Sequence, residues 1–286
     1  DVLLLDEPTN HLDASAVEWL QNWLEHYEGA LVLITHDRYV LDRITTRMVE
    51  IDNGEAFKMN LLVIPARGGS KRIPKKNIKN FKGKPIIEWA IKEAIRSNIF
   101  DKLIVSTDNE EIAEISKKAG ADVPFLRPEQ LSDDLTSTSE VIIHAIEWFK
   151  LKGINFSNVC CLYPTAVFIK SFELIKALKE LEASNKEFFI FSATTFPSPI
   201  QRALFVDQDG FSKMFNPDLK NTRSQDLVQA YHDAGQFYFA SSKTWLKNTN
   251  IFDNGKPMIL PRWRSQDIDT IEDWEMAEFI FTRLNK

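Results

Sequence analysis

The fold of this chain is best predicted by one stretch, Met59-Asn60-Leu61-Leu62-Val63-Ile64-Pro65-Ala66-Arg67-Gly68-Gly69-Ser70-Lys71. An apolar strand is expected over 60–65, and a basic loop with a glycine pair follows it directly. Glycines let a backbone approach a ligand closely, free amides donate to oxygen atoms, and lysines offset negative charge. From Arg67 to Lys84 the chain has eight Lys or Arg residues and no acidic residue. A merely solvated turn would not explain this combination, so the loop predicts a phosphate-binding site.

Strands and helices alternate from this loop to the end of the chain. Strands are expected over 102–106 and 158–162, and strands with turns over 187–240. Helices are expected from Pro85 to about Ser97, from a capping segment at 108–111 to Ala119, near 139–150 and 170–183, and over 271–284. The pattern predicts an α/β fold with a mostly parallel sheet and helices on both faces. Ligands of such sheets bind beyond the carboxyl ends of the strands, where the basic loop lies.

The chain changes character at Lys58–Met59. Before this point, strands are expected over 2–5, 30–34 and 47–51, a helix with apolar positions Val17, Leu20 and Leu24, and a short helix over 38–44. These elements form a β-α-β-α-β piece with too few strands for an obvious stand-alone domain. We therefore expect two domains, 1–58 and 59–286, with Met59 as an initiator of the second.

Composition excludes some classes of protein. The chain has 286 residues with 44% hydrophobic and 27% charged residues, and its net charge of −6 argues against general nucleic-acid binding. No apolar stretch reaches the roughly 18 residues that a membrane span needs. The two cysteines, Cys160 and Cys161, are adjacent in an apolar run and are expected to be small core residues. We expect a reduced, cytoplasmic protein.

Residues 1–57 carry motifs of an ATPase. Asp6 and Glu7 end the apolar run 2–5, Asn10-His11-Leu12-Asp13 follows, and Thr35-His36-Asp37 comes after the second strand. The segment resembles the second nucleotide-binding domain of F-type ATP-binding cassette proteins, a ribosome-linked class. The resemblance implies a Walker B pair, a D-loop and a switch histidine of a P-loop ATPase.

The phosphate-binding part of that ATPase is missing from the sequence. The string G-x-x-x-x-G-K-[ST] occurs nowhere in the chain, and phosphoryl transfer depends on it. We favour a non-functional remnant, as from a gene fusion or frameshift, over a trans-acting or regulatory piece, because positioned acids without a phosphate cradle have nothing to act on.

The chain from Met59 to its end resembles the sialic-acid-type cytidylyltransferases, which join CMP from CTP to a nine-carbon keto-sugar acid. Six further strings support the resemblance: Ser106-Thr107-Asp108, Leu126-Arg127-Pro128-Glu129-Gln130-Leu131, Pro199-Ile200-Gln201-Arg202-Ala203-Leu204, Asn221-Thr222-Arg223-Ser224-Gln225-Asp226-Leu227, Tyr231-His232-Asp233-Ala234-Gly235-Gln236-Phe237-Tyr238 and Gln266-Asp267-Ile268-Asp269-Thr270. Several of these look most like family members that act on pseudaminic acid. One departure is Tyr163-Pro164-Thr165-Ala166-Val167, where a Pro often follows the alanine. The resemblance implies a Rossmann-like nucleotide-diphospho-sugar transferase fold.

The resemblance also implies roles for the nucleotide-binding residues. Arg67, Ser70, Lys71 and Lys76 would hold the triphosphate, with Lys71 best placed, beside Arg67, to stabilise charge that develops at the α-phosphorus. Three residues would hold the cytidine: Asn77, Arg127 and Ser137.

Two carboxylates are expected to bind Mg²⁺. Asp267 and Asp269 are two residues apart, so on an extended strand they share one face. Mg²⁺ typically takes one or two carboxylates together with phosphate oxygens. Spacing alone favours a turn or a helix cap over a metal site, and the family resemblance reverses that preference in favour of the metal.

A guanidinium is the natural partner of the sugar carboxylate. Arg223 is the first candidate and Arg202 the second, with His232, Gln236 and Tyr238 lining the sugar pocket. His232 could equally be structural. No general base stands out.

The expected reaction is transfer of CMP from CTP to pseudaminic acid with release of pyrophosphate. The alternatives are the same reaction on N-acetylneuraminic or legionaminic acid and, from another class, an ATP-binding fragment. The resemblance implies dimers in which a C-terminal excursion reaches across the partner, so a homodimer is expected, without nucleic-acid or membrane partners.

Overall fold

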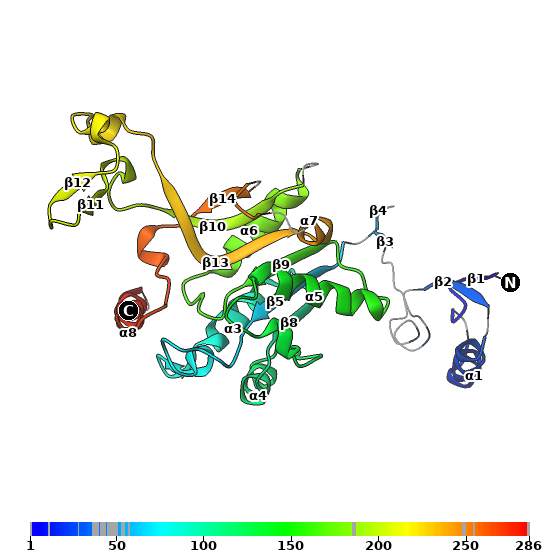
Figure 1. Cartoon of the computed structure of the whole chain (residues 1–286). Coiled ribbons are helices and arrows are strands. Elements are labelled where there is room, and N and C mark those ends of the chain that lie inside the picture. Colours follow the sequence, from blue (N-terminus) through cyan, green and yellow to red (C-terminus); the bar gives the residue numbers. More distant parts are fainter. Residues whose placement is uncertain are drawn as a thin grey trace. The chain divides into compact units, whose positions relative to one another are not determined.

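The computed structural model describes residues 2–10, 12–27, 29–35, 40, 44, 51–52, 55–56, 58–184, 187–247, 250–253 and 255–284. The chain divides into two compact units. One contains residues 1–57 together with Trp148–Asn155, and the other contains Lys58–Glu147 and Phe156–Lys286. The larger unit holds the sheet that positions the candidate site (Figure 1).

A six-stranded sheet is the centre of the larger unit as far as the structure describes it. Its strand order is β14-β10-β13-β9-β5-β8, and every neighbouring pair is parallel except those that β13 makes with β9 and β10. The expected, mostly parallel sheet is therefore confirmed. The strands are β5 (Asn60–Pro65), β8 (Lys102–Ser106), β9 (Asn158–Leu162), β10 (Phe189–Thr195), β13 (Tyr231–Ser241) and β14 (Gly255–Ile259).

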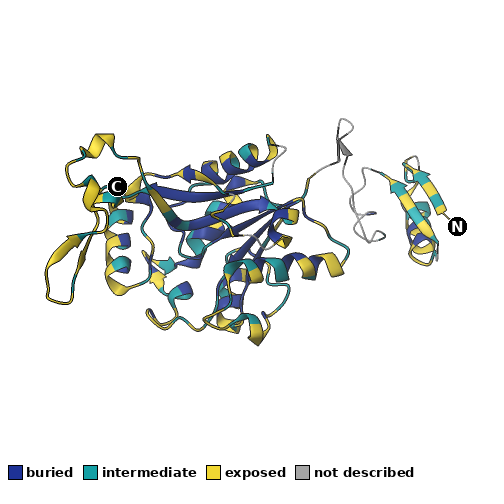
Figure 2. Ribbon diagram, turned by 45° about the horizontal axis from the view of Figure 1, so that its top comes forward, coloured by how far each residue is buried: buried dark blue, intermediate teal, exposed yellow. Residues whose placement is uncertain are grey.

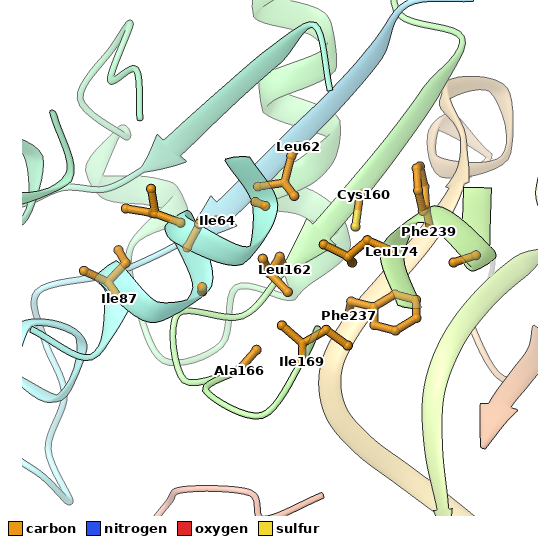
Figure 3. Packing of buried hydrophobic residues seen from close by; sticks show 14 of the residues in the cluster. Leu62, Ile64, Ile87, Cys160, Leu162, Ala166, Ile169, Leu174, Phe237 and Phe239 are labelled. Atoms are coloured by element: carbon orange, nitrogen blue, oxygen red, sulfur yellow. The ribbon is translucent and has the colours of Figure 1, made fainter. Parts of the chain in front are cut away.

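Strands β5 and β9 of this sheet contain continuous apolar runs, which suits strands that are covered on both faces. Leu61, Leu62, Val63 and Ile64 of β5 are each 0% exposed, because helices or loops cover both faces of the sheet. Figure 2 shows these strands as the buried interior of the larger unit. Figure 3 shows the core cluster on one face, where Leu62 and Ile64 pack with Leu162 of β9 and with residues of β13 and the neighbouring helices.

The described residues from 58 to 284 contain six α-helices: α3 (Ile87–Ser97), α4 (Glu110–Lys118), α5 (Thr138–Leu151), α6 (Ser171–Glu182), α7 (Ser242–Leu246) and α8 (Ile271–Leu284). Helices α3, α4 and α6 supply residues to the cluster of Figure 3. The ring of Trp245 in α7 packs against Phe189, and its Nε1 donates to the Val159 carbonyl. Helix α8 builds a second cluster, in which Trp274 meets Phe81 edge-on with ring centroids 5.4 Å apart.

Two expected helix starts differ from the structure. Helix α3 begins at Ile87 and not at Pro85, because Pro85 belongs to β7 (Lys84–Pro85), which pairs with β6 (Asn80–Phe81). Helix α4 is capped by Asn109, whose side chain accepts from the Ile112 amide. The expected capping acid, Asp108, instead accepts from the amide of Gly68 in the basic loop.

The stretch between β10 and β13 forms an excursion from the sheet, residues 199–230. It contains short 3-10 helices and a hairpin of β11 (Leu204–Val206) and β12 (Ser212–Met214). Figure 1 shows this hairpin away from the central sheet, and Figure 2 shows that most of it is exposed.

The smaller unit contains a short parallel pair of strands. Strands β1 (Val2–Asp6) and β2 (Ala30–Ile34) pair in register, and α1 (Ala14–Glu25) connects them. A short antiparallel pair follows, β3 (Ile51–Asp52) with β4 (Glu55–Ala56). The helix expected over 38–44 and most of the strand expected over 47–51 lie outside the described residues. No helix among the described residues of either unit has the length and apolar character to cross a membrane.

Candidate nucleotide-binding site

A cavity of about 290 Å³ lies where the chain leaves the carboxyl ends of β5 and β9. This is the edge at which parallel sheets bind ligands. Most of the lining is polar or charged, as a nucleotide site requires. The lining residues are Pro65, Arg67, Ser70, Lys71, Arg72, Ile73, Lys76, Asn77, Arg127, Leu131, Asp133, Asp134, Thr136, Thr138, Val141, Tyr163, Pro164, Thr165 and Asp269.

The basic loop after β5 is held close to the start of α4. The Gly68 amide donates to Asp108 Oδ1 at 2.8 Å. A Cβ atom on Gly68 would lie 3.0 Å from Asn109 Cβ, so a larger residue would push the loop away. At the other end of the loop, buried Asn77 donates through Nδ2 to the Arg67 carbonyl at 2.9 Å. These contacts fold the loop back on itself and direct its cations toward the cavity.

Four cations of this loop line the cavity, and two carboxylates hold them. Asp134 pairs with Arg67 at 2.8 Å and with Lys71. Asp269 pairs with Arg72 at 3.0 Å and with Lys76 at 3.2 Å. The Lys71 contact in turn holds the pKa of the Asp134 carboxyl below its usual value, with the charge of Arg67 adding to the effect. Arg67, Ser70, Lys71 and Lys76 are therefore brought together as the sequence predicts.

Arg127 is a buried cation at the wall of the cavity, only 6% exposed. Its Nε donates to Ser106 Oγ at 3.1 Å, and its Nη2 donates to the Ser106 carbonyl. Burial lowers its pKa to about 10, so the guanidinium stays charged at neutral pH. Arg127 and Asn77 both line the cavity, and their N–H groups are donors of the kind that a polar base edge accepts.

The two expected metal ligands differ in their surroundings. Asp269 lines the cavity, whereas Asp267 is not among the described residues of its lining and lies beside Gly235 of β13. Burial, and then the charge of Asp269, raise the pKa of Asp267 above its usual value. A divalent cation would relieve that repulsion, so this donor pair fits Mg²⁺ with phosphate oxygens as further ligands. Nowhere in the described ranges do three or more His, Cys, Asp or Glu residues form a ready metal cluster.

Three expected sugar-pocket residues lie on β13, and none is among the described residues that line the cavity. Tyr238 donates its hydroxyl to Asp233, and its ring meets Tyr163 edge-on at 5.6 Å. Gln236 is 2% exposed, and its Nε2 donates to the Arg264 carbonyl at 2.5 Å. His232 is exposed, and its ring packs against Phe196 at 4.8 Å.

Both expected carboxylate-binding arginines lie on the excursion 199–230. Arg202 donates to Ser224 Oγ at 3.3 Å and to the Lys220 carbonyl at 3.2 Å. Arg223 stands at the start of a neighbouring 3-10 turn (Ser224–Asp226). Neither is among the described residues around the cavity of the same chain.

Ser137 occupies the start of α5, and not the cavity wall. Its hydroxyl oxygen accepts from the Glu140 amide at 3.3 Å, so this residue caps the helix, and its amide and hydroxyl donate to Glu140 Oε2 at 2.7 Å. Its neighbours Thr136 and Thr138 line the cavity instead, and Thr138 Oγ1 lies 2.8 Å from the Tyr163 hydroxyl. Sequence reasoning missed these two threonines and Asp134, which all lie in the mostly polar run 132–138.

The ATPase motifs of the smaller unit are partly described. Asp6 ends β1, and Glu7 accepts from Thr35 Oγ1 at 3.2 Å, so the expected Walker B pair lies at the ends of the two strands. Asp13 caps α1 by accepting from the Ala16 amide at 2.8 Å. His11, His36 and Asp37 of the expected D-loop and switch lie outside the described residues.

Known proteins resemble the larger unit. A family described as Cytidylyltransferase matches residues 61–271. Pseudaminic acid cytidylyltransferase of Campylobacter jejuni subsp. jejuni serotype O:2 is 45% identical over 223 residues, which cover 78% of this chain and 96% of that protein. CMP-N,N'-diacetyllegionaminic acid synthase of Legionella pneumophila subsp. pneumophila is 32% identical, over 76% of this chain and 94% of that protein.

The similarity to one solved structure supports the fold of this chain and not its function. CMP:2-keto-3-deoxy-manno-octonic acid synthetase complexed with CTP aligns with a TM-score of 0.58 at 13% identity, over 79% of this chain and 99% of that one. The family match does not extend to residues 1–57, whose resemblance to an ATPase stays a prediction. For the greater part of the sequence the fold, the matched family and the close relatives agree, and the chain belongs to the cytidylyltransferase family.

Proposed function

We propose that this chain transfers CMP from CTP to the anomeric hydroxyl of pseudaminic acid and releases pyrophosphate. The observation that carries the proposal is the cavity itself, in which Arg67, Lys71 and Lys76 face the same space as buried Arg127. A cationic wall beside a fixed polar donor suits a ligand with a charged tail and a polar base. The pseudaminic acid cytidylyltransferase of C. jejuni, at 45% identity, supports the choice of sugar.

The residues of the basic loop would act on the triphosphate by positioning and by charge. Arg67, Ser70 and Lys71 would hold its oxygens, and Lys71 would stabilise the negative charge that develops as the sugar hydroxyl attacks the α-phosphorus. The sugar oxygen bonds to the α-phosphorus and its proton passes to solvent, while the bond from the α-phosphorus to the bridging oxygen breaks and pyrophosphate leaves with the electron pair. Lys76, in the same loop, pairs with Asp269 at 3.2 Å.

Asn77 and Arg127 would hold the cytidine, because both are buried donors at the wall of the cavity. Asp267 and Asp269 would hold Mg²⁺, which when bound neutralises phosphate charge. Ser137 would also contact the cytidine. The support for this role is its position between Thr136 and Thr138, which line the cavity.

We propose that the enzyme acts as a homodimer in which the excursion 199–230 of one subunit completes the sugar site of the other. Arg202 and Arg223 of the excursion are not among the described residues that line the cavity of the same chain, and the excursion also carries exposed apolar side chains. Phe211, Phe215 and Val228 are 70%, 63% and 81% exposed. Burial of such residues against a second subunit would stabilise the pair and bring a guanidinium to the sugar carboxylate.

Mixing two inactive variants tests the dimer. If Arg223→Ala and Lys71→Ala each lose turnover, a mixed dimer regains part of it when both lesions fall in the same composite site and the other composite site is intact. A mixture that stays inactive after subunit exchange shows that each chain uses its own excursion.

The substrate is tested by supplying CTP and Mg²⁺ with pseudaminic, N-acetylneuraminic or legionaminic acid and measuring pyrophosphate. We expect turnover to be fastest with pseudaminic acid. Turnover of N-acetylneuraminic acid without turnover of pseudaminic acid would overturn the sugar assignment and leave the reaction class standing.

We further propose that residues 1–58 form a separate segment that takes no part in this reaction, and that the enzyme acts in the cytoplasm. The rival function, ATP turnover by the smaller unit, rests on Asp6 and Glu7 at the strand ends. ATP hydrolysis by the full chain without any sugar acid would favour the rival.

A further inference from the structure

One carboxylate of the cavity contacts both cations that the proposed reaction assigns to the attacked phosphate. The two oxygens of Asp134 are divided between them: Oδ1 lies 2.8 Å from Arg67 Nη1, and Oδ2 pairs with Lys71 Nζ. Arg67 Nη1 also donates to the backbone carbonyl of Asp133 at 2.7 Å. A carboxylate that bridges a guanidinium and an ammonium occupies the donors that a phosphate group would use.

The loop that carries Asp134 is shaped by local hydrogen bonds and not by core packing. Asp133 Oδ1 accepts from the amides of Leu135 and Thr136 at 3.0 and 2.7 Å, and from Thr136 Oγ1 at 2.6 Å. The side chain of Asp134 is 45% exposed, and Leu135 at the tip is 90% exposed. Asp134 can therefore release its partners by a side-chain rotation without exposing buried apolar surface.

From this arrangement we infer that Asp134 is an internal competitor of the triphosphate and so helps to set the affinity and anion selectivity of the site. The inference rests on the proposed assignment of Arg67 and Lys71 to the phosphates. An incoming anion has to replace Asp134 on both cations. A polyphosphate brings several charges to the two donors, whereas a singly charged anion only exchanges one carboxylate for an equivalent group. Cytidine has no phosphate, so its binding does not displace Asp134 from the two cations.

A matched pair of ions outside the cavity provides the control. Lys75, in the same loop, pairs with Glu111 of α4 at 2.6 Å, and neither residue is among the described residues of the cavity wall. Glu111→Gln and Asp134→Asn make the same change in net charge and remove one acid from a partner in the same basic loop. The two variants differ in whether the freed cations face the cavity.

The test is calorimetric titration of the full-length protein with pyrophosphate, CTP and cytidine, each with and without Mg²⁺. For Asp134→Asn we expect pyrophosphate and CTP to bind about 3- to 10-fold more tightly without Mg²⁺, the effect of losing two exposed ion pairs. Cytidine affinity stays unchanged in this variant. Glu111→Gln changes none of the three affinities by more than about 2-fold, because its partner is outside the cavity.

Two outcomes would overturn the inference. Unchanged pyrophosphate affinity in Asp134→Asn would show that the ion pairs do not compete, and weaker binding confined to Mg²⁺ would instead make Asp134 part of a cation site. Unchanged circular dichroism confirms that each variant is folded. These readouts are independent of the proposed reaction: a wild-type protein that binds CTP but transfers CMP to none of the sugar acids would contradict the proposed function and leave the comparison of Asp134 intact.

Discussion

Strands β5 and β1 begin the two units of this chain with similar sequences and very different surroundings. Both are short apolar runs followed by functional motifs, Asn60–Pro65 before the basic loop and Val2–Asp6 before the ATPase acids. Leu62 of β5 is 0% exposed, whereas Leu4 of β1 is 70% exposed. The comparison teaches that an apolar run predicts a strand but not the layers that cover it.

The number of neighbouring strands and helices explains the difference. Strand β5 has β8 and β9 on its two sides within a six-stranded sheet. Strand β1 has β2 as its partner in a two-stranded sheet, and two strands bury little apolar surface. Among residues 2–44 that the structure describes, the buried side chains are Gln21, Leu24 and Val40.

The largest contrast is expected in catalysis. Lys71→Ala should lower kcat for CMP transfer by about 10²- to 10³-fold, because it removes a cation from the charge that develops at phosphorus. The matched change in the smaller unit, Glu7→Gln, should leave the rate within 2-fold, since no step uses that residue. Initial rates of pyrophosphate release measure both. A large loss in Glu7→Gln would show that the ATPase motifs take part.

The second-largest difference between β5 and β1 is expected in their contributions to stability. Leu62→Ala leaves a cavity in the core and should lower the free energy of unfolding by about 2–5 kcal/mol. Leu4→Ala removes an exposed side chain and should change it by less than about 0.5 kcal/mol. Urea unfolding of the full chain, followed by circular dichroism and by loss of CTP binding, compares them. Equal losses would mean that β1 is covered in solution.

A smaller effect is expected from pH. His144 of α5 lies near Arg127, and its Nδ1 has no hydrogen-bond partner among the described residues. Burial, and then the charge of Arg127, lower the pKa of His144 below its usual value. The folded chain thus favours the neutral imidazole more than the unfolded chain does. The free energy of unfolding keeps its full value above the unfolded-state pKa of about 6.5 and falls as the pH drops through it toward the folded-state pKa.

Urea midpoints at pH 7.5 and 5.5 measure this loss. The difference between the two pH values should shrink in His144→Gln. It should persist in His26→Gln, because His26 is an exposed residue of α1 in the other unit. If the pH dependence is unchanged in His144→Gln, other groups cause it.

The smallest effect is expected from deletion. Removal of residues 1–58 should leave CTP-dependent turnover within about 2-fold, because the core of the larger unit is built from residues beyond the cut. Loss of activity on deletion, in a variant that still shows the circular dichroism of a folded α/β protein, would show that the segment is functionally joined to the enzyme.

Much of the fold was predictable because its signals are local. The helix expected over 271–284 is α8 (Ile271–Leu284), and the strand expected over 30–34 is β2 (Ala30–Ile34). The errors arose where a tertiary contact overrides a local signal. Pro85 is compatible with a first helical turn, yet pairing with Asn80 keeps it in β7, and Asp108 is drawn from the helix cap to the Gly68 amide.

The candidate site was predictable only where its residues share one loop. Arg67, Ser70, Lys71 and Lys76 follow one strand, so a strand and its loop suffice to bring them together. Arg127 and Asp269 also reach the cavity, but only their family resemblance indicated this. Asp134 was missed, because an acid in a polar run has no local feature that pairs it with a cation 63 residues away.

The sequence by itself determined the alternation of strands and helices and the basic loop with its glycine pair. These depend on side-chain periodicity and backbone freedom, which act over a few residues. Only the tertiary structure decided that β5 is buried while β1 is exposed, that Asp134 and Asp269 hold the loop cations, and that Arg202 and Arg223 lie on an excursion away from the cavity. Burial and ion pairing depend on which distant segments meet, and the order of strands in the sheet determines that.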